Sequence, residues 1–346
     1  MIINDIVPAQ ELTGFIREID PALYGFDLDR FLPNQYREQV EYAFNRSDRT
    51  RADVASYRAF DVEAEIAKRP GFARVRGQIP PMSRKIPLGE ELRLQLEALR
   101  GYDAGIAQQV YDDAALIVEG MLARIELARG AALTTGAVPF TVDAGFSSNV
   151  TVNYGTPTAL TAPGISWSTS ATAIPVSNLM TMHTDYKAAN GGMPAAYVLT
   201  STEVINAVLS ATSTKSWFAM NGVTPELITL DAVNTLLGRF GVPPLVANDT
   251  LVSVNGVATR VIPRTQVTFL PQPNVATFGE TTFGITAEAL ELLSSNAFES
   301  VAAAPGLVGL NMKTFDPVSV WTKVAGLVLP VIKDAAKIGV RSGVIA

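Results

Sequence analysis

The chain has 346 residues, too many for one ordinary core, so we expect two packed bodies with extensions. Hydrophobic residues make up 48% and charged residues 17%, a balance that allows a large core and excludes disorder as a global description. The lack of cysteine excludes disulfides, iron–sulfur clusters and cysteine nucleophiles, the single histidine excludes any site with two imidazoles, and the formal charge of −6 disfavours a nucleic-acid-reading module.

The ends and the apolar runs of the sequence show no membrane or targeting signal. The N-terminus lacks the basic region and the long apolar run of a signal peptide. No stretch of about 20 apolar residues is present for a membrane span. We therefore expect a protein that is made in the cytosol, has no membrane partner, and is either soluble or self-associating.

The first 48 residues are acidic and make a poor domain. They contain four basic and nine acidic residues. Residues 8–19 predict a short helix, because Pro8 suits a first helical turn. The segment that follows is broken by proline and glycine, yet it carries large apolar side chains, among them Phe26 and Phe31, which an isolated arm cannot bury. We expect this arm to lie on a larger body, of its own chain or of a neighbouring one.

The next segment is basic and carries the clearest local pattern. Residues 49–85 contain nine basic and four acidic residues, so the two adjacent segments can attract each other within or between subunits. Residues 60–66 and 73–79 each alternate apolar with charged or polar positions, which indicates two β-strands. One antiparallel register satisfies this pattern, with these pairs: Glu65 with Arg74, Glu63 with Arg76, Ala64 with Val75 and Phe60 with Ile79.

This hairpin, or ribbon, is expected to touch another subunit. Pro80-Pro81 is predicted to end the pairing, and a two-stranded ribbon with no third strand is marginally stable alone in water. The plainer alternative is a hairpin on the main sheet. The residues predicted at contacts between subunits are Phe60, Glu63, Glu65, Lys68, Arg69, Arg74 and Arg76 of the ribbon, with Phe26 and Phe31 of the arm.

A long helix follows. A helical run over 90–99 is broken at Gly101-Tyr102-Asp103, and Asp103 can cap a second helix that Gly130 would end. This second helix, over 103–129, would be about 40 Å long, a strut across a flat body. Its packing face is an apolar stripe with three- and four-residue spacing, made of Ile106, Val110, Ala114, Ile117, Met121 and Ile125.

The remainder reads as a mixture of strands and helices. Residues 134–170 predict a β-rich connector. The elements expected after it are a helix over 176–190, a buried strand at 196–199, helices over 203–211 and 230–240, a hairpin at 251–262 turning on Asn255-Gly256, strands at 266–270 and 274–278, and strand-like runs at 318–324 and 327–332. The last segment is expected to return to the body of the long helix.

No catalytic motif is found in the sequence. The phosphate-binding glycine motifs, the nucleophile elbow and the zinc-protease motif are all missing. His183 lies on the apolar stripe of its helix, where a buried histidine is the simpler interpretation, and Asp185 points to another face. Ser319 and Lys323 could form a dyad, but nothing places an oxyanion hole beside them. We predict a protein that is not an enzyme and has no catalytic, cofactor-binding or metal-binding residues.

The ordered set of these features resembles the lambda-like major capsid proteins of tailed phages, the major capsid protein E family, which have the Hong Kong 97-type fold. The resemblance covers nearly the whole chain, and the sequence departs from the lambda protein in most side chains and in the uncharged tract 144–184. The segments that carry it, after the acidic arm, are IPPMSRKIPLGEE, RGAALTTGAVPFTVDAGFSSNVTVNYGT, ISWST, IPVSNLMTMHTDY, AAYVLTSTEVINAVL, ATRVIPRTQVTFLPQPNVATFGETTFGIT and KTFDPVSVWTKVAGLVLPVIKDAAKIGVRSGV.

The resemblance implies an α+β fold and a role for each part. Its domains would be an N-terminal arm (1–45), an extended β-hairpin E-loop (46–86), a peripheral domain with a long spine helix (87–195 and 310–346) and an α/β axial domain (196–309). It implies a virion shell protein that forms hexamers and pentamers around double-stranded DNA, contacted non-specifically at most. The partners it implies are a portal, a scaffold with protease, and in some members a cementing protein; it implies no cofactor.

Two other classes stay open on the sequence alone. One is a non-viral shell protein of the same fold, an encapsulin-like compartment, which cargo enzymes or a cargo peptide would favour. The other is a two-domain α/β enzyme, which a monomer with a deep polar pocket near His183 and Asp185 would favour.

Overall fold

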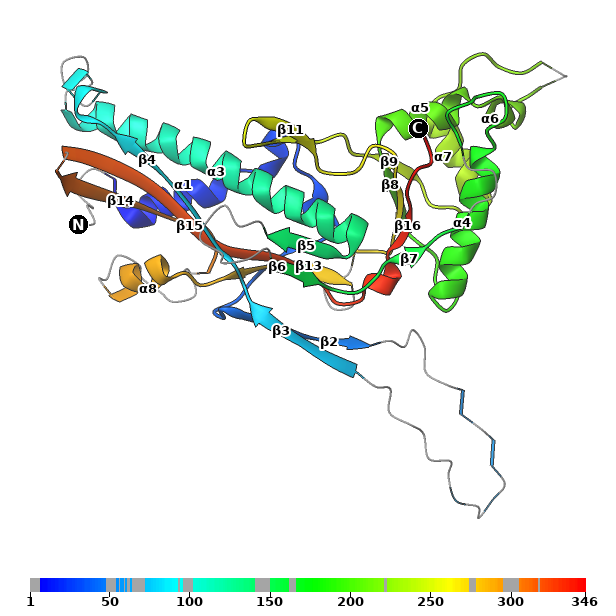
Figure 1. The fold of residues 1–346 in the computed structure, drawn as a ribbon, viewed down its shortest axis with the longest axis horizontal. Helices are drawn as coiled ribbons and strands as arrows, with labels where there is room; N and C mark the ends of the chain where they lie inside the picture. The colour runs from blue at the N-terminus through cyan, green and yellow to red at the C-terminus, as the bar shows by residue number, and fades with distance from the viewer. Residues whose placement is uncertain are drawn as a thin grey trace.

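The structure is a computed structural model of the chain. It describes residues 7–47, 54–55, 57–58, 60, 63, 72–92, 94–95, 102–140, 150–161, 166–220, 223–273, 278–294, 305–316 and 318–346. The molecule is elongated: a long body built on one helix and one sheet joins a second, helix-rich body at one end, and a two-stranded ribbon projects from the long body (Figure 1). No helix among these residues is long and apolar enough to cross a membrane.

The long body is built on a five-stranded sheet. Its central strand β15 (Val318–Ile332) joins the two runs expected at 318–324 and 327–332 into one strand. It pairs antiparallel with its three neighbours, and β1 pairs parallel with β13. The neighbouring strands are β4 (Pro81–Leu88), β13 (Gly279–Gly284), β14 (Val308–Phe315) and β1 (Asn34–Tyr36). The pairing of the ribbon ends at Gln78, before Pro80-Pro81, as predicted. Pro81 then begins β4, which pairs with β15 of the long sheet instead.

The spine helix α3 (Tyr102–Thr135) lies on this sheet, as the sequence predicted. All six residues of the expected stripe are buried, and they pack against Val320, Val324 and Val328 of β15. The predicted stop at Gly130 is wrong: the helix continues to Thr135 and ends before Gly136, which has the left-handed φ of 68°. Gly130 is instead a packing residue, since a Cβ there would lie 2.4 Å from the carbonyl oxygen of Val261.

This close approach makes a prediction about stability. Gly130→Ala should destabilise the chain by about 2 kcal/mol, because the added methyl overpacks against backbone that cannot swing aside. Gly120→Ala on the same helix is the matched control: its Cβ would meet only the flexible end of Arg84, at 3.0 Å, and should stabilise by about 0.5 to 1 kcal/mol. Urea denaturation of both variants measures the difference, and equal midpoints would contradict the packing role of Gly130.

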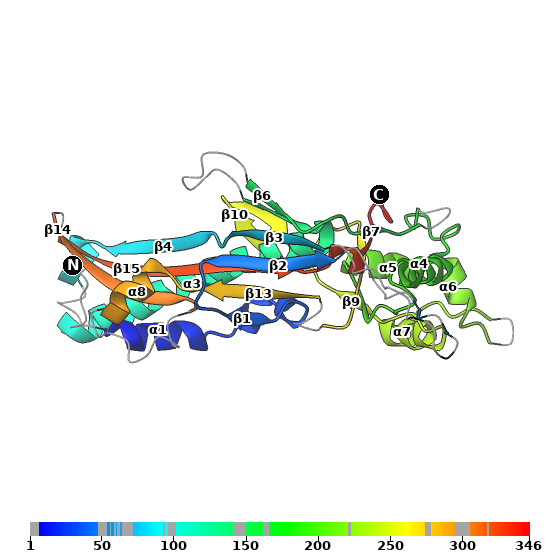
Figure 2. The same ribbon diagram turned by 90° about the horizontal axis from the view of Figure 1, so that it is seen from below.

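The second body is a mixed five-stranded sheet covered by helices (Figure 2). In sheet order its strands are β7 (Thr158–Ala159), β16 (Gly339–Arg341), β12 (Val267–Leu270), β8 (Tyr197–Thr200) and β9 (Leu245–Ala247). Its helices are α4 (Pro175–Ala189), α5 (Thr202–Ser210), α6 (Thr212–Ser216) and α7 (Leu230–Arg239). The three helices predicted here are thus confirmed as α4, α5 and α7, and one core containing Trp167, Leu179, Leu237 and Phe269 lies between helices and sheet.

Hairpins and short elements complete the chain. The hairpin of β10 (Leu251–Val254) and β11 (Val257–Arg260) is confirmed, with left-handed φ at Asn255 and Gly256. β5 (Ala137–Phe140) and β6 (Val150–Asn153) form a second hairpin, in the connector expected to be β-rich. The remaining elements are α1 (Ala9–Glu18), η1 (Pro21–Tyr24), η2 (Leu28–Arg30), β2 (Glu41–Ser47), β3 (Phe72–Gln78), α8 (Ala287–Ser294) and η5 (Ala335–Lys337).

The resemblance gave residues 196–309 to the axial domain and residues 310–346 to the peripheral domain. Two strands in these ranges lie in the other body. β13, inside the range 196–309, pairs with β15 of the long sheet, and β16, inside 310–346, pairs with β12 of the second body. Most of the strand expected at 274–278 lies outside the described residues, and Phe278 is in the turn before β13. The chain thus crosses between the two bodies more often than a single insertion would require.

Candidate assembly surfaces

The N-terminal arm is packed along its own chain. Leu12 and Ile16 of α1 lie over Gly309 of β14, where a Cβ would be 2.4 Å from Ile16. Phe26 is 6% exposed and Phe31 is 1% exposed, and the Phe31 ring packs edge-on against Tyr197 at 5.4 Å between centroids. These two residues were predicted to contact another subunit. That expectation is corrected, since their own chain leaves them almost no surface for a neighbour.

A buried ion pair on the spine helix holds the arm. Glu126 and Arg129 have side chains 0% and 3% exposed, and their charged atoms are 3.2 Å apart. Glu126 Oε1 accepts hydrogen bonds from the backbone N–H groups of Asp27 and Leu28, both at 2.9 Å. Burial raises the pKa of Glu126 and lowers the pKa of Arg129, against the opposing effect of the attraction between them. The sequence analysis missed this pair.

Arg129 extends the contact to the long sheet. Its guanidinium donates to Asn34 Oδ1 of β1 at 2.6 Å and to Thr281 Oγ1 of β13 at 3.0 Å. The second body holds the same arm segment, because Asn248 donates to Asp27 Oδ1 at 2.9 Å and Thr250 donates to the carbonyl of Gly25 at 3.0 Å. Residues 25–34 therefore bind both bodies at once and fix how one sits against the other.

The ribbon has a different register from the predicted one. β3 pairs antiparallel with β2, so that Arg76 lies opposite Ala43 and Arg74 opposite Asn45. The predicted partner Glu63 is not in this ladder, and Ile79 donates to the carbonyl of Val40 instead of pairing with Phe60. Glu65 lies outside the described residues. Two residues of the predicted first strand are described, Phe60 and Glu63, and neither is in a strand. The predicted pairs of Glu63 with Arg76 and of Phe60 with Ile79 are therefore wrong, the pairs of Ala64 and Glu65 fall on residues outside the described ones, and β3 itself is confirmed.

The predicted contact residues of the ribbon divide into two groups. Phe60, Glu63, Arg74 and Arg76 are exposed, Phe60 to 97%. Glu65, Lys68 and Arg69 lie outside the described residues. Among the described strands, β2 and β3 form a sheet of two, with no third strand. A two-stranded ribbon buries few of its own side chains. The exposed side chains of this ribbon are therefore candidates for contact with another molecule.

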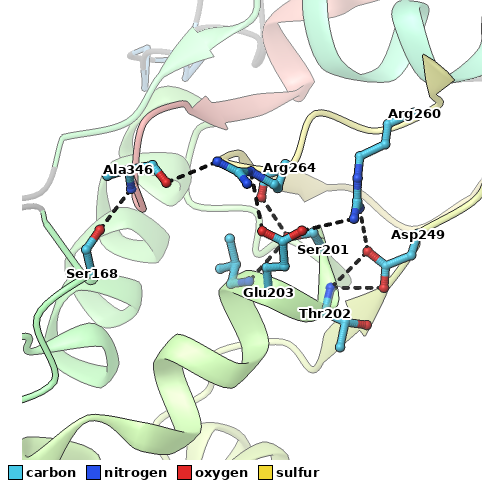
Figure 3. Close-up of polar contacts among 9 residues, drawn as sticks. Ser168, Ser201, Thr202, Glu203, Asp249, Arg260, Arg264 and Ala346 are labelled. Carbon is cyan, nitrogen blue, oxygen red and sulfur yellow. Dashed lines mark hydrogen bonds and ion pairs between the residues drawn. The ribbon is translucent and has the colours of Figure 1, made fainter. Parts of the chain in front are cut away.

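A polar network joins α5 to the neighbouring hairpin and, through Arg264, to the turn before β12 (Figure 3). Arg260 donates to Asp249 at 2.7 Å and to Glu203 at 3.0 Å, and Thr202 donates its N–H to both Asp249 oxygens at 3.2 Å. Burial raises the pKa of Asp249, but the hydrogen bonds from Thr202 and Arg260 outweigh it and hold the pKa below its usual value. Ser201 caps α5 by accepting from the N–H of Val204. These contacts stabilise the second body and contain no nucleophile paired with a base.

His183 and Asp185 do not form a site together. His183 is 2% exposed and stacks on Phe269 with ring centroids 6.1 Å apart. Asp185 accepts instead from the N–H and hydroxyl of Thr161. Among the described residues no group of three or more acidic or imidazole side chains could hold a metal ion. The interpretation of His183 as a buried core residue is confirmed.

The burial of His183 predicts an acid-sensitive second body. Burial, and secondarily Lys187, lowers its pKa from the ordinary 6.5. As the pH falls below about 6.5, the unfolded chain takes up a proton that the folded chain resists, so stability is lost by at most about 1.4 kcal/mol per pH unit until the folded-state pKa is reached. His183→Phe keeps the ring stacking without the titration. Melting temperatures between pH 7 and pH 5 should fall less in this variant, and parallel curves would refute the assignment.

Comparison with known proteins agrees with this arrangement. The structure is similar to a protein assigned as the capsid protein of a prophage of Escherichia coli CFT073, with a TM-score of 0.64, 14% identity and 100% of each chain covered. It is also similar to a phage-related protein from Bordetella bronchiseptica RB50, with a TM-score of 0.55, 12% identity, and 95% of this chain and 94% of that chain covered. No curated protein sequence matches. The fold is α+β and of the Hong Kong 97-like capsid type.

The family follows from the sequence itself. The pattern of the family described as phage major capsid protein E matches residues 9–338. The chain belongs to this family. It is therefore a structural component of a phage capsid shell and not an enzyme.

Proposed function

We propose that the chain assembles as hexamers and pentamers into an icosahedral shell that encloses the double-stranded DNA of a tailed phage, after synthesis in the cytoplasm of the bacterial host. The observation that carries the proposal is the projecting ribbon of β2 and β3 together with Val54, Tyr57 and Phe60, which lie between these strands in the chain and are 95% to 106% exposed. Large apolar side chains with that exposure are costly in a solitary molecule and useful in a shell, where every copy offers the same limb and the same receiving surface.

Each part of the fold has a role in this proposal. The E-loop, 46–86, reaches towards a neighbour, and the ribbon lies over a neighbouring spine helix, while the arm, 1–45, packs its described residues along its own chain. The peripheral domain is built around α3 and the long sheet. The family resemblance gives it residues 87–195 and 310–346. The axial domain, taken from 196–309, has loops that meet around the five- and sixfold axes. The strand pairings support moving β13 to the peripheral domain and β16 to the axial domain.

The proposed partners follow from shell assembly. They are other copies of the chain, a portal and a scaffold with protease; the family adds a cementing protein in some members. Packaged DNA would be contacted non-specifically at most. The formal charge of −6 supports this last point, because a negative wall repels a phosphate backbone while the genome enters.

Electron microscopy of the purified protein tests the proposal. Expression of the chain, with a scaffold where one is required, should give closed particles of uniform diameter. Particles that protect DNA from nuclease support the phage shell, while particles filled with a protein cargo support the encapsulin-like alternative. A stable, compact monomer at high protein concentration, with the ribbon protected from proteolysis, contradicts both.

A further inference from the structure

The strand β14 forms one edge of the long sheet, and the arm helix α1 covers this edge. In sheet order β14 comes last, with β15 on its inner side and no strand of the described residues on its outer side. Thr13 of α1 takes the place of a neighbouring strand, since its hydroxyl accepts from the N–H of Gly309 at 3.1 Å and donates to the Gly309 carbonyl at 3.4 Å. An uncovered strand edge can pair with another chain. The helix therefore lies where a further strand would otherwise add to the sheet.

Further contacts hold α1 at this edge, but the cover is incomplete at one residue. Leu12 and Ile16 are 0% and 1% exposed and lie over Gly309. Arg17 donates to two backbone carbonyls just before β14, at 3.1 and 3.0 Å. Asn311 is 3% exposed, and its Nδ2 donates to the arm backbone at 3.4 Å, while its Oδ1 has no hydrogen-bond partner among the described residues. A buried acceptor without a partner is unfavourable, so another strand would satisfy this part of the edge better.

We propose that α1 guards this edge, and that displacement of α1 opens β14 to antiparallel pairing with β14 of a second copy of this chain. The outward backbone groups of Gly309 recur at every second residue, so those of Asn311 have the same orientation. When Asn311 lies opposite Asn311, Gly309 lies opposite Lys313, and no like charges meet across the ladder. Each Asn311 amide then donates to the oxygen of the other. The contact joins equal surfaces about a two-fold axis and does not depend on the proposed shell.

Cysteine cross-linking tests the edge and its register. The chain has no cysteine, so Asn311→Cys introduces a single thiol. In the proposed pair two such residues are opposite each other at about 5.5 Å between Cα atoms, within disulfide range. Leu12→Glu/Ile16→Glu puts two charges into the buried face of α1 and should raise the yield of disulfide dimer at least tenfold. Met312→Cys in the same background is the control for register. Its yield should be at least tenfold lower, because residue 312 lies opposite residue 310.

A second pair of charges is the matched control for displacement. Gln10→Glu/Gly14→Glu has the same four-residue spacing on the exposed face of α1, where a Cβ on Gly14 meets nothing, and should leave the dimer yield unchanged. Thr13→Val removes only the hydroxyl and should raise the yield at least threefold. This variant decides the result if circular dichroism shows that the doubly charged variant does not fold. Equal cross-linking with α1 in place and displaced, or equal yields at residues 311 and 312, would overturn the proposal.

Discussion

Reversing the two ribbon charges, Arg74→Glu with Arg76→Glu, should abolish shell assembly and leave the helical content of the subunit unchanged. Both side chains are exposed on β3, and their backbone partners across the ladder are Asn45 and Ala43, so the reversal does not enter the core. Exposed substitutions of this kind usually change folding stability by less than about 0.5 kcal/mol. Like charges brought together at a repeated contact cost several kcal/mol each time. Assembly multiplies that cost over every copy.

The measurement is shell yield after sedimentation, with circular dichroism on the unassembled subunit. Arg74→Lys with Arg76→Lys is the matched control, because it keeps both charges, and it should assemble normally. A normal shell yield from the reversed variant would show that the basic row of the ribbon does not face a neighbouring copy. Loss of helical signal in the reversed variant would place its effect on folding instead of assembly.

Features with a strong local cause could be predicted from the sequence. The Asn255-Gly256 turn requires left-handed backbone that these two residues tolerate, so the hairpin around it was correctly predicted. The apolar stripe of α3 was correct for a similar reason, because three- and four-residue spacing places its members on one face. In both cases the information lies within a few residues of the element itself.

The ribbon register depends on a partner that is distant in sequence, and the pattern could not select it. Residues 73–79 alternate in a way that fits any alternating strand, and the pairing with 60–66 was preferred because opposite charges faced each other. In the structure β3 instead pairs with β2, and Tyr42 packs where Gly77 has no side chain: a Cβ on Gly77 would lie 2.6 Å from the Tyr42 hydroxyl. The observed register thus places a small residue opposite a large one, and it does not form the predicted pair between Glu63 and Arg76.

The N-terminal arm is a second case in which the sequence could not identify the packing partner. Its apolar residues were correctly predicted to need a larger body, but the sequence could not say whose body that is, and the structure buries Phe26 and Phe31 in their own chain. The buried ion pair beneath them was missed. One signal was available: Arg129 lies four residues after Ile125, on the line of the buried stripe, where an arginine needs a partner.

The ion pair carries the second large prediction. Glu126→Gln should destabilise the subunit by about 3 kcal/mol, because it leaves the guanidinium of Arg129 inside the protein without its carboxylate. The glutamine oxygen can still accept from the N–H groups of Asp27 and Leu28, so the loss reports the charge and the hydrogen bond that Glu126 accepts from Arg129, and not the contacts to the arm backbone. Urea denaturation of the unassembled subunit measures the change. The exposed pair Arg30–Asp27 has the same three-residue spacing, and Arg30→Gln, its matched control, should cost about 0.5 kcal/mol or less.

A double variant tests whether the effects of Glu126 and Arg129 on stability depend on each other. In Glu126→Gln with Arg129→Gln no buried charge remains, so the double variant should be less destabilised than the sum of the two single variants by at least about 1 kcal/mol. Additive losses would mean that the two side chains act independently. Because Glu126 and Arg129 also hold residues 27–34 against the long body, the single variant should expose this arm segment to proteolysis before the rest of the chain unfolds. An arm that stays as protected as in the unmodified protein would show that the apolar contacts of Phe26 and Phe31 are enough to hold it.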